Sequence, residues 1–506
     1  MTGDQISRRP HVVVIGDVVL DRDVEGSATR LSPDGPVPVV DVADVRESPG
    51  GAGLAALLCV ERGARVSLVA PIAADEAGDR LAARLGEAMT VVRLPHTGPT
   101  RTKTRVRSGG QSLVRVDDGG PAGPGQVDPS EVRLVLDAAD LVLVSDYGAG
   151  VTRDEELRRL LAATAMRSRL LWDPHPRGGA PVPAASLVTP NVAEARSTAP
   201  DDAATPDVLA ADLVTRWQAE SVCVTAGSDG AYLGRSGQEP VFFPAIEAGG
   251  DPCGAGDALA ASCAVALAGG STVTDAVERG VAHASAWVAS GGADGFRARR
   301  CARSTDADDV GDVASAVRTG SGPRDGSETS AERDPRAVIG NGVPAEPEAL
   351  TRLAARLRAD GGTLVATGGC FDLVHAGHVA TLEAARRLGD HLVVLMNSDA
   401  SVTRLKGPGR PVVPAADRAR VLAALDCVDA VVVFDEDDPR AMLDRLQPDV
   451  WAKGGDYGTA PLPESEVVRH HGGRVVVLPY VDGRSTTSII ERSGLARVHS
   501  DGRSTA

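Results

Sequence analysis

The feature that most constrains this chain is a repeated alternation of short β-branched runs with helices rich in Ala, Leu and Arg. Each run is apolar and ends in Gly, Asp or Pro, which is typical of strands buried on both faces of a parallel sheet. Helices between such strands cover the sheet. We therefore expect an α/β protein whose ligands bind where strands end and helices begin. The strands expected in the first half are His11–Asp17, Arg65–Ala70, Leu141–Asp146, Leu170–Pro174, Leu187–Pro190 and Ser221–Gly227.

A stretch poor in large apolar residues interrupts this alternation from residue 303 to residue 347 of the 506-residue chain. Its content of Gly, Ser, Asp, Pro and Glu is that of a flexible linker. The sequence thus predicts one domain at residues 1–302 and a smaller one at residues 348–506. The strands expected in the second domain are Thr363–Thr367, His391–Asn397, Ala430–Phe434, Val450–Ala452 and Arg474–Leu478.

Charge and cysteine usage exclude several classes of protein. The net charge of −16 disfavours binding to nucleic acid, whose phosphates the chain would repel. No run of about 20 apolar residues is present, so we expect no membrane span. The seven Cys are scattered and form no C-x-x-C pair, which argues against disulfides and zinc. A cytoplasmic protein is therefore expected.

Two segments of the first half, Val37–Val45 and Arg101–Asp117, do not follow the strand–helix rhythm. Apolar and polar residues alternate along the second of them, which predicts a small antiparallel sheet standing off the domain. That sheet would carry Lys103, one of only three lysines among 53 basic residues. Because arginine replaces lysine almost everywhere else, Lys103, Lys406 and Lys453 are candidates for sites that need a compact ammonium group. The alternative is that they are ordinary surface charges.

A first chemical site is expected at residues 254–257, Gly-Ala-Gly-Asp, which precede an apolar small-residue helix. At a helix start, Gly254, Ala255 and Gly256 would leave N–H groups free to stabilise negative charge on a phosphoryl group. Asp257 could then accept the proton of an attacking hydroxyl. The tetrapeptide alone is equally compatible with an Asp that only caps the helix.

The neighbouring motifs favour the chemical interpretation. Gly50 and Gly51 begin another helix, Asn191 and Glu194 follow a strand, and the pair Thr225 and Gly227 follows the next one. This set, in this order, resembles the ribokinase-like (PfkB) sugar kinases. The D-x-D pair formed by Asp21 and Asp23 also resembles the nucleophile loop of haloacid-dehalogenase phosphatases. That chemistry needs a lysine and further acidic loops downstream, and Lys103 is the only lysine in this half.

The PfkB resemblance implies a role for each of these residues. Asp257 would be the base, and the glycines before it would form the anion hole. The lid would direct Lys103 and Arg105 toward a substrate phosphate and pair two chains into a homodimer. The nucleotide would lie near Asn191, Glu194, Thr225 and Gly227. Its Mg²⁺ ion would lie near Glu194, without direct ligands from the protein. The sugar would lie near Asp17, Gly50 and Gly51.

A second chemical site is expected after the strand Thr363–Thr367. His375 and His378 are three residues apart, so they share one face as a helix begins, and Gly377 lets a phosphate approach the backbone. A metal site is the alternative, but no third ligand is evident nearby. The H-x-G-H loop resembles the nucleotidylyltransferase superfamily, in which both histidines would donate hydrogen bonds to nucleotide phosphates. Further nucleotide-binding residues expected by this resemblance are Gly369, Phe371, Asp372, Lys406, Lys453, Gly454, Ser485, Thr486 and Thr487.

The two motif sets in this order resemble the bifunctional heptose 7-phosphate kinase/heptose 1-phosphate adenylyltransferases. The resemblance implies two ATP-dependent steps of ADP-heptose synthesis, with a ribokinase-like domain and its β lid linked to a Rossmann-like transferase domain. Leu54, Ala149 and His175 depart from the family pattern, which has Asn, Lys and Lys there. The alternatives are a kinase half with another substrate or without catalysis, and CTP instead of ATP in the second half.

Overall fold

The computed structural model describes residues 9–109, 111–119, 123–125, 127–199, 203–305, 337–339, 347–455 and 462–479. The chain divides into two compact units, one formed by residues 1–237 and 245–307 and the other by residues 238–244 and 308–506. Most of the predicted linker lies outside the described residues. Among the residues that are described, no helix is both long enough and apolar enough to cross a membrane.

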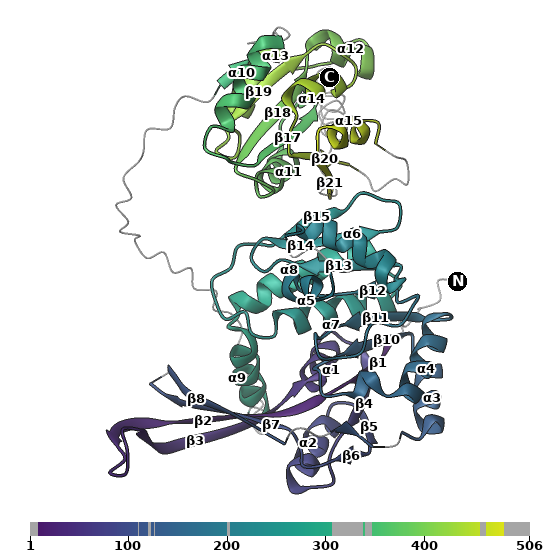
Figure 1. Ribbon diagram of the computed structural model, residues 1–506, viewed down its shortest axis with the longest axis vertical. Helices are drawn as coiled ribbons and strands as arrows, with labels where there is room; N and C mark the ends of the chain where they lie inside the picture. Colours follow the sequence, from purple (N-terminus) through teal and green to yellow (C-terminus); the bar gives the residue numbers. More distant parts are fainter. Residues whose placement is uncertain are drawn as a thin grey trace, which may run out of the picture. The chain divides into compact units, whose positions relative to one another are not determined.

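The first unit is built on a twisted sheet with the strand order β14-β13-β12-β11-β10-β1-β4-β5 (Figure 1). Neighbouring strands are parallel except for β13 and β14. Every residue of β1 and β10 is buried, as their continuous apolar runs predict. The strands are β1 (His11–Gly16), β4 (Arg65–Pro71), β5 (Thr90–Leu94), β10 (Leu141–Ser145), β11 (Arg169–Asp173), β12 (Leu187–Val188), β13 (Ser221–Thr225) and β14 (Gly230–Arg235).

The helices of the first unit differ in how deeply they are buried. α1 and α7 consist mainly of small and apolar residues, are buried over most of their length and pack against each other. The outer helix α2 has one apolar face and begins at Asp75, whose carboxylate accepts the N–H of Gly78. The helices are α1 (Ala52–Glu61), α2 (Glu76–Gly86), α3 (Pro129–Asp137), η1 (Val151–Arg153), α4 (Glu155–Ala165), α5 (Val192–Thr198), α6 (Pro206–Trp217), α7 (Ala255–Ala268), α8 (Val273–Ala289) and α9 (Gly292–Thr305).

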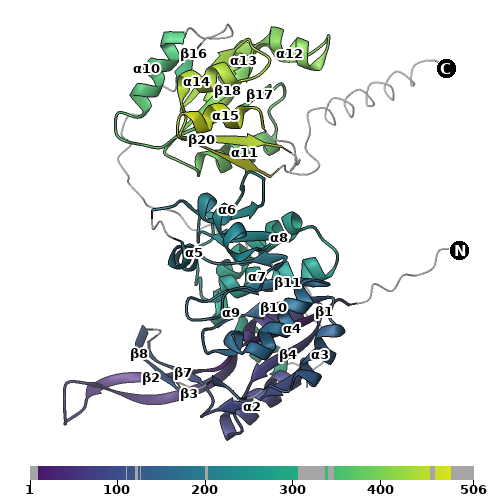
Figure 2. The same ribbon diagram turned by 45° about the vertical axis from the view of Figure 1, so that its right-hand side comes forward.

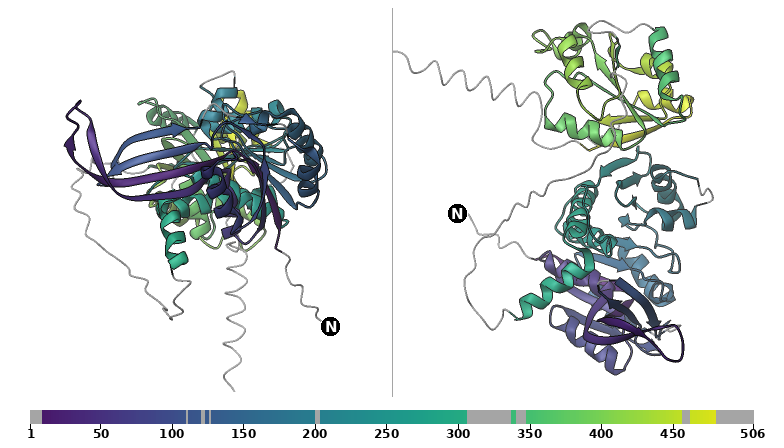
Figure 3. Two further views of the ribbon diagram at one scale, coloured as in Figure 1. Left: turned by 90° about the horizontal axis from the view of Figure 1, so that it is seen from below. Right: turned by 90° about the vertical axis from the view of Figure 1, so that its left-hand side faces the viewer.

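A second sheet, the lid, extends from the body of this unit (Figures 2 and 3). Its strand order is β3-β2-β7-β8. The prediction of a purely antiparallel lid is wrong, because β2 and β7 are parallel. The sequence pattern missed β2, which follows β1 almost directly and leaves the body in the same direction as β7. The strands are β2 (Val18–Leu31), β3 (Pro38–Gly51), β7 (Thr102–Ser108) and β8 (Gln111–Asp118), with a separate small pair, β6 (His96–Thr97) and β9 (Gly123–Pro124).

The second unit contains a parallel sheet with the order β16-β19-β18-β17-β20-β21. Successive residues of β19 are all buried, so side chains on both faces of the sheet are covered. The strands are β16 (Ala337–Ile339), β17 (Leu364–Gly369), β18 (His391–Asn397), β19 (Ala430–Phe434), β20 (Val450–Gly454) and β21 (Arg474–Leu478), and β15 (Val241–Pro244) clusters with this unit. The helices are α10 (Pro347–Leu357), α11 (Ala376–Arg386), α12 (Asp399–Lys406), α13 (Ala415–Ala423), α14 (Arg440–Leu446) and α15 (Glu464–His470).

Both sheets contain a point at which the strand order reverses. In the first unit, β1 lies between β4 and β10, and in the second, β17 lies between β18 and β20. At such a point the connections leave toward opposite sides and open a crevice at the carboxyl ends of the strands. Catalytic and ligand-binding residues are therefore expected in the loops after β1, β10, β17 and β20.

Candidate active sites

Helix α7 begins at a glycine and has no side-chain cap. Gly254 is the N-cap residue, with φ of 81°. A Cβ there would lie 3.2 Å from Trp287 and 3.3 Å from Leu54, so the backbone conformation and the packing both favour glycine. Nothing lies within 4 Å of a Cβ placed on Gly256, whereas the N–H of Ala255 already donates to a preceding carbonyl. The predicted anion hole is thus an uncapped helix start with open space beside Gly256.

Asp257 lies in the first turn of α7, and its side chain is buried. The phenol O–H of Tyr147 donates to both carboxylate oxygens, at 2.7 Å each. Burial raises the pKa of Asp257 to about 7, and the charge of Asp21 contributes to the rise, while Tyr147 and Lys103 lower this pKa. A carboxylate that titrates near neutral pH is suited to act as a general base.

Asp17 occupies the crevice after β1 but is committed to the backbone. Its Oδ2 accepts the N–H groups of Tyr147 (3.3 Å) and Ala149 (2.9 Å), and its Oδ1 accepts that of Val151 (3.3 Å). The carboxylate that the sequence predicted at the sugar therefore organises the loop after β10. Ala149 contributes its N–H to this arrangement, a contact that does not depend on its side chain.

Gly50 and Gly51 lie at the end of β3, against a carboxylate that the sequence analysis did not assign to the sugar site. A Cβ on Gly50 would lie 2.3 Å from Oδ2 of Asp21, and Gly51 has φ of 61°. Asp21 forms an ion pair with Arg105 at 3.1 Å and is opposite Lys103 in the β2–β7 register. The D-x-D spacing is the available sequence signal for Asp21, although it resembles a phosphatase motif.

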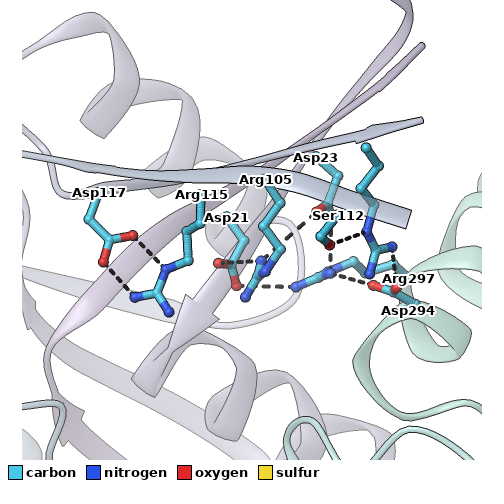
Figure 4. Close-up of polar contacts among 9 residues, drawn as sticks. Asp21, Asp23, Arg105, Ser112, Arg115, Asp117, Asp294 and Arg297 are labelled. Atoms are coloured by element: carbon cyan, nitrogen blue, oxygen red, sulfur yellow. Dashed lines mark hydrogen bonds and ion pairs between the residues drawn. The ribbon is translucent and has the colours of Figure 1, made fainter. Parts of the chain in front are cut away.

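An alternating set of carboxylates and guanidinium groups holds the base of the lid (Figure 4). Arg297 of α9 donates to Asp21 at 3.1 Å, to Asp23 at 3.0 Å and to Asp294 at 2.8 Å. Arg107 of β7 pairs with Asp294 at 2.6 Å. The structure therefore places Arg105, predicted to bind substrate phosphate, beside a carboxylate, while Lys103 has no ion pair among the described residues.

A pocket of about 330 Å³ lies beside the start of α7. Thr225 and Gly227, predicted to bind nucleotide, line it together with Ala255 and Gly256 of the predicted anion hole. The backbone of Asn191 forms an isolated parallel bridge with Thr225, which brings the two predicted motifs side by side. The residues predicted to bind nucleotide and those predicted to bind phosphate thus lie around one cavity. Its remaining lining is largely apolar, as a nucleoside requires.

Asn191 and Glu194 form a capping box at the start of α5. The Asn191 side chain accepts the N–H of Glu194 at 2.9 Å, and Oε2 of Glu194 accepts the N–H of Asn191 at 2.8 Å. Burial raises the pKa of Glu194 and raises that of Asp173 well above its usual value, with Glu194 adding to the latter shift. Both carboxylates would be stabilised as anions by a nearby cation.

The three departures from the family pattern have distinct surroundings. Leu54 is buried, and its side chain lies close to Gly254. Burial lowers the pKa of His175, whose Nδ1 accepts the N–H of Arg177 at 3.1 Å. His175 also packs against Gly148, where a Cβ would lie 2.4 Å from Nδ1. Two of the three departures are therefore packing residues next to the predicted site.

In the second unit, the H-x-G-H loop joins β17 to α11. His375 is the N-cap residue, and its Nδ1 accepts the N–H of Gly377 at 3.2 Å. Its ring stacks on that of His378 with centroids 4.0 Å apart, and Phe371 lies 5.3 Å from His378 on the same measure. Burial and the neighbouring His375 lower the pKa of His378 to about 4, so its imidazole is neutral at physiological pH. The ring of Phe371 also lies over Gly369.

Asp372 is buried and fixes the loop before α13. Its Oδ1 accepts the N–H groups of Val412 (2.6 Å) and Val413 (3.2 Å), and Oδ2 pairs with Arg410. Burial opposes ionisation, but these hydrogen bonds hold the pKa of Asp372 below its usual value. The residue predicted to bind nucleotide therefore shapes the loop that follows Lys406, which is itself exposed.

Arg418 is a residue that the sequence analysis missed. It is fully buried and donates to the carbonyl oxygens of Cys370 and Val413 and to Oδ1 of Asp399, the last two at 2.9 and 2.7 Å. It thereby joins the loop after β17 to the loop before α13 and to the start of α12. The available signal was its place on the apolar stripe of α13, between Ala415 and Leu422.

Lys453 lies at the end of β20, next to the H-x-G-H loop across the strand-order reversal. Its Nζ pairs with Oε1 of Glu464 at 2.8 Å. A Cβ on Gly454 would lie 3.1 Å from Thr381 of α11, so the end of β20 approaches α11 closely. The predicted residues Ser485, Thr486 and Thr487 lie outside the described residues.

Comparisons with known proteins identify the family. Residues 9–298 match the pfkB family carbohydrate kinases, and residues 366–492 match the cytidylyltransferase-like family. The Bifunctional protein HldE of Streptomyces coelicolor is 48% identical over 502 residues, which cover 97% of this chain and 99% of that protein. The chain belongs to the HldE family. The HldE protein of Azotobacter vinelandii is 38% identical over 490 residues, covering 96% and 97% of the two chains.

Membership of the HldE family and of the pfkB family confirms the predicted fold class, an α/β kinase domain followed by a transferase domain. It also confirms that the chain is an enzyme with kinase and nucleotidyltransferase halves.

Among solved structures, phosphofructokinase-2 from Escherichia coli in its tetrameric inhibited form is 18% identical, with a TM-score of 0.45. The match covers 58% of this chain and 99% of that one.

Proposed function

We propose that the chain catalyses both transfers of ADP-heptose biosynthesis. Residues 1–302 transfer the γ-phosphoryl group of ATP to the C1 hydroxyl of D-glycero-β-D-manno-heptose 7-phosphate. Residues 348–506 transfer the adenylyl group of a second ATP to heptose 1-phosphate, and residues 303–347 link the two domains. A separate phosphatase removes the 7-phosphate between the two steps. Membership of the HldE family supports this assignment.

The observation that carries the kinase proposal is a buried carboxylate at the open start of a helix beside a nucleoside-sized pocket. Asp257 accepts the proton of the sugar hydroxyl, and the hydroxyl oxygen attacks the γ-phosphorus. ADP leaves as the bond to the β-phosphate oxygen breaks. The uncapped N–H groups at Gly256 and Asp257 stabilise the charge that builds on the transferred group.

A Mg²⁺ ion bound with ATP would neutralise part of the charge of the phosphates. Among the residues that the structure describes, no group of three or more His, Cys, Asp or Glu side chains could hold a metal ion. The raised pKa values of Glu194 and Asp173 mark two carboxylates that a neighbouring cation would stabilise. These two residues fit a role in holding the water ligands of the ion.

The transferase half works without a base. A phosphate oxygen of heptose 1-phosphate is already a nucleophile, and its attack on the α-phosphorus releases pyrophosphate. His375 and His378 lie at the start of α11, where their imidazoles and the helix N–H groups favour the developing negative charge. Lys453, at the end of β20, supplies positive charge from the other side of the crevice once it exchanges Glu464 for phosphate.

The full-length chain allows each reaction to control for the other. With Mg²⁺ and ATP, we expect Asp257→Asn to lower kinase turnover about 10²- to 10⁴-fold and leave adenylyl transfer unchanged. His378→Ala should lower pyrophosphate release and leave kinase turnover unchanged. No phosphorylation of heptose 7-phosphate by the wild type would overturn the kinase assignment and favour a different sugar phosphate or a non-catalytic module. Preference for CTP over ATP would overturn the adenylyl assignment.

The chain acts as a cytoplasmic homodimer that pairs through the lid. Support comes from the large apolar side chains exposed on the lid, Leu31, Val37, Val42, Val45, Leu113, Val114 and Val116. Sheets that expose this much apolar surface are commonly covered by a partner. In sedimentation, we expect a dimer for the wild type and a monomer for Val114→Asp, with Leu134→Asp, an exposed apolar position on α3, as the control. A monomeric wild type would contradict the proposal.

A further inference from the structure

The phenol of Tyr147 and the carboxylate of Asp257 come from different elements and meet inside the kinase unit. Tyr147 lies on the loop after β10, and Asp257 lies in the first turn of α7. One phenol hydroxyl contacts both carboxylate oxygens at 2.7 Å. Such a short contact from a neutral donor to both oxygens restricts the rotation of the carboxylate.

Two carboxylates fix the loop that carries Tyr147. Asp17 accepts N–H groups from three of its residues, as described above. Asp146 accepts the N–H of Gly148 and the hydroxyl of Thr152, at 2.7 Å each. Gly148 and Gly150 have φ of 69° and 113°, values that glycine adopts without strain. The phenol is therefore held in place before any substrate arrives.

The contact leaves the carboxylate able to react. A carboxylate has about four lone-pair sites, so one donor still leaves room for the sugar hydroxyl. Burial and the charge of Asp257 raise the pKa of Tyr147 well above its usual value, so the phenol remains a donor throughout the physiological range. The other charged groups around Asp257 are Asp21 of β2, Lys103 of β7 and Asp173 of β11. Lys103 stabilises the ionised carboxylate, and the two aspartates oppose it.

We propose that Tyr147 is a positioning residue of the kinase reaction, which orients Asp257 and keeps it ionised, and that Asp17 holds the loop from which Tyr147 acts. This inference rests on the proposed role of Asp257 as the base. The opposing interpretation is that the phenol occupies the place of the acceptor hydroxyl and must leave before substrate binds. The two interpretations predict opposite effects when the hydroxyl is removed.

The test is the pH dependence of kinase kcat in full-length wild type and Tyr147→Phe, with ATP and heptose 7-phosphate saturating. Loss of a hydrogen bond to a charged group should move the acid limb upward by about one to two pH units. Turnover at pH 7 should then fall about tenfold and recover at high pH, with the KM for ATP unchanged. Tyr232→Phe, at a buried tyrosine in β14 of the same unit, should leave the acid limb in place.

The outcomes separate the inference from the proposed function. A wild type without kinase turnover contradicts the proposed function itself. A wild type that turns over, with an unmoved acid limb in Tyr147→Phe, overturns the positioning role even if kcat falls. A higher kcat or a lower KM for the sugar phosphate in Tyr147→Phe also overturns it, because the phenol would then be an obstacle. Adenylyl transfer by the same preparations confirms that each variant is intact in its second half.

Discussion

The two candidate active sites of this chain differ in how burial affects their titratable groups. The kinase site gathers carboxylates in a buried space, and burial raises the pKa of Asp257 to about 7. In the transferase site burial instead lowers the pKa of His378 to about 4, and the nearby carboxylate Asp372 is held ionised by its hydrogen bonds. The difference follows from the nucleophiles. A sugar hydroxyl must lose a proton, so its site needs a base, whereas a phosphate monoester requires only donors and cations.

The support of the two sites differs as well. In the kinase unit, Tyr147 donates to both carboxylate oxygens of Asp257, the proposed base, and Asp17 accepts N–H groups of the loop that carries Tyr147. In the transferase unit, a single buried cation, Arg418, joins three segments around the H-x-G-H loop. The first arrangement affects the pKa of Asp257. The second fixes the positions of three segments through a guanidinium group.

The largest effect is expected from Arg418→Met. The substitution leaves the carbonyl oxygens of Cys370 and Val413 without their donor, which costs about 1–3 kcal/mol for each buried group. We expect the second unit to unfold at a lower temperature in calorimetry and adenylyl transfer to fall at least tenfold, with kinase turnover unchanged. Arg420→Met, at an exposed position of the same helix, is the matched control. Equal effects of the two substitutions would show that Arg418 is an ordinary helix residue.

The pH dependence of the two activities should differ in one and the same preparation. Asp257 must be ionised to accept a proton, so kinase kcat should fall as pH drops through about 7, by up to about tenfold per pH unit. His378 stays neutral above its pKa of about 4, so adenylyl transfer should be nearly constant from about pH 5.5 to about pH 8. An acid limb near pH 6.5 in adenylyl transfer would contradict the lowered pKa of His378.

The smallest effect is expected at the base of the lid. Arg297→Gln removes one of the two cations beside Asp21 and Asp23, so Arg105 alone is left to neutralise the two lid aspartates. We expect the KM for the sugar phosphate to rise about fivefold, equivalent to about 1 kcal/mol, with kcat nearly unchanged. Arg300→Gln, at an exposed position of the same helix, should change neither value. A loss of kcat without a change in KM would place Arg297 in another role.

Local patterns were sufficient for most of the parallel strands, whereas β5 and β16 were not expected. Continuous apolar runs identified β1 and β10 because a strand buried on both faces has no polar side. The alternation in β7 and β8 identified part of the lid. The long strand β2 was missed because its polar residues face charges from other segments, which a local pattern does not contain.

Local sequence patterns indicate the two α/β units and the residues that are candidates for phosphate binding and proton transfer, because buried strands, glycine turns and isolated lysines leave local signatures. Which carboxylates are occupied by backbone contacts depends on the folded chain. Asp17 and Asp372 accept hydrogen bonds from backbone N–H groups. Asp21 and Arg418 lie at the two sites although no site role was expected for them from the sequence. A polar side chain in a crevice forms hydrogen bonds with the groups that the fold places within about 3 Å of it. These groups can lie more than 100 residues away along the chain, where no local pattern reveals them.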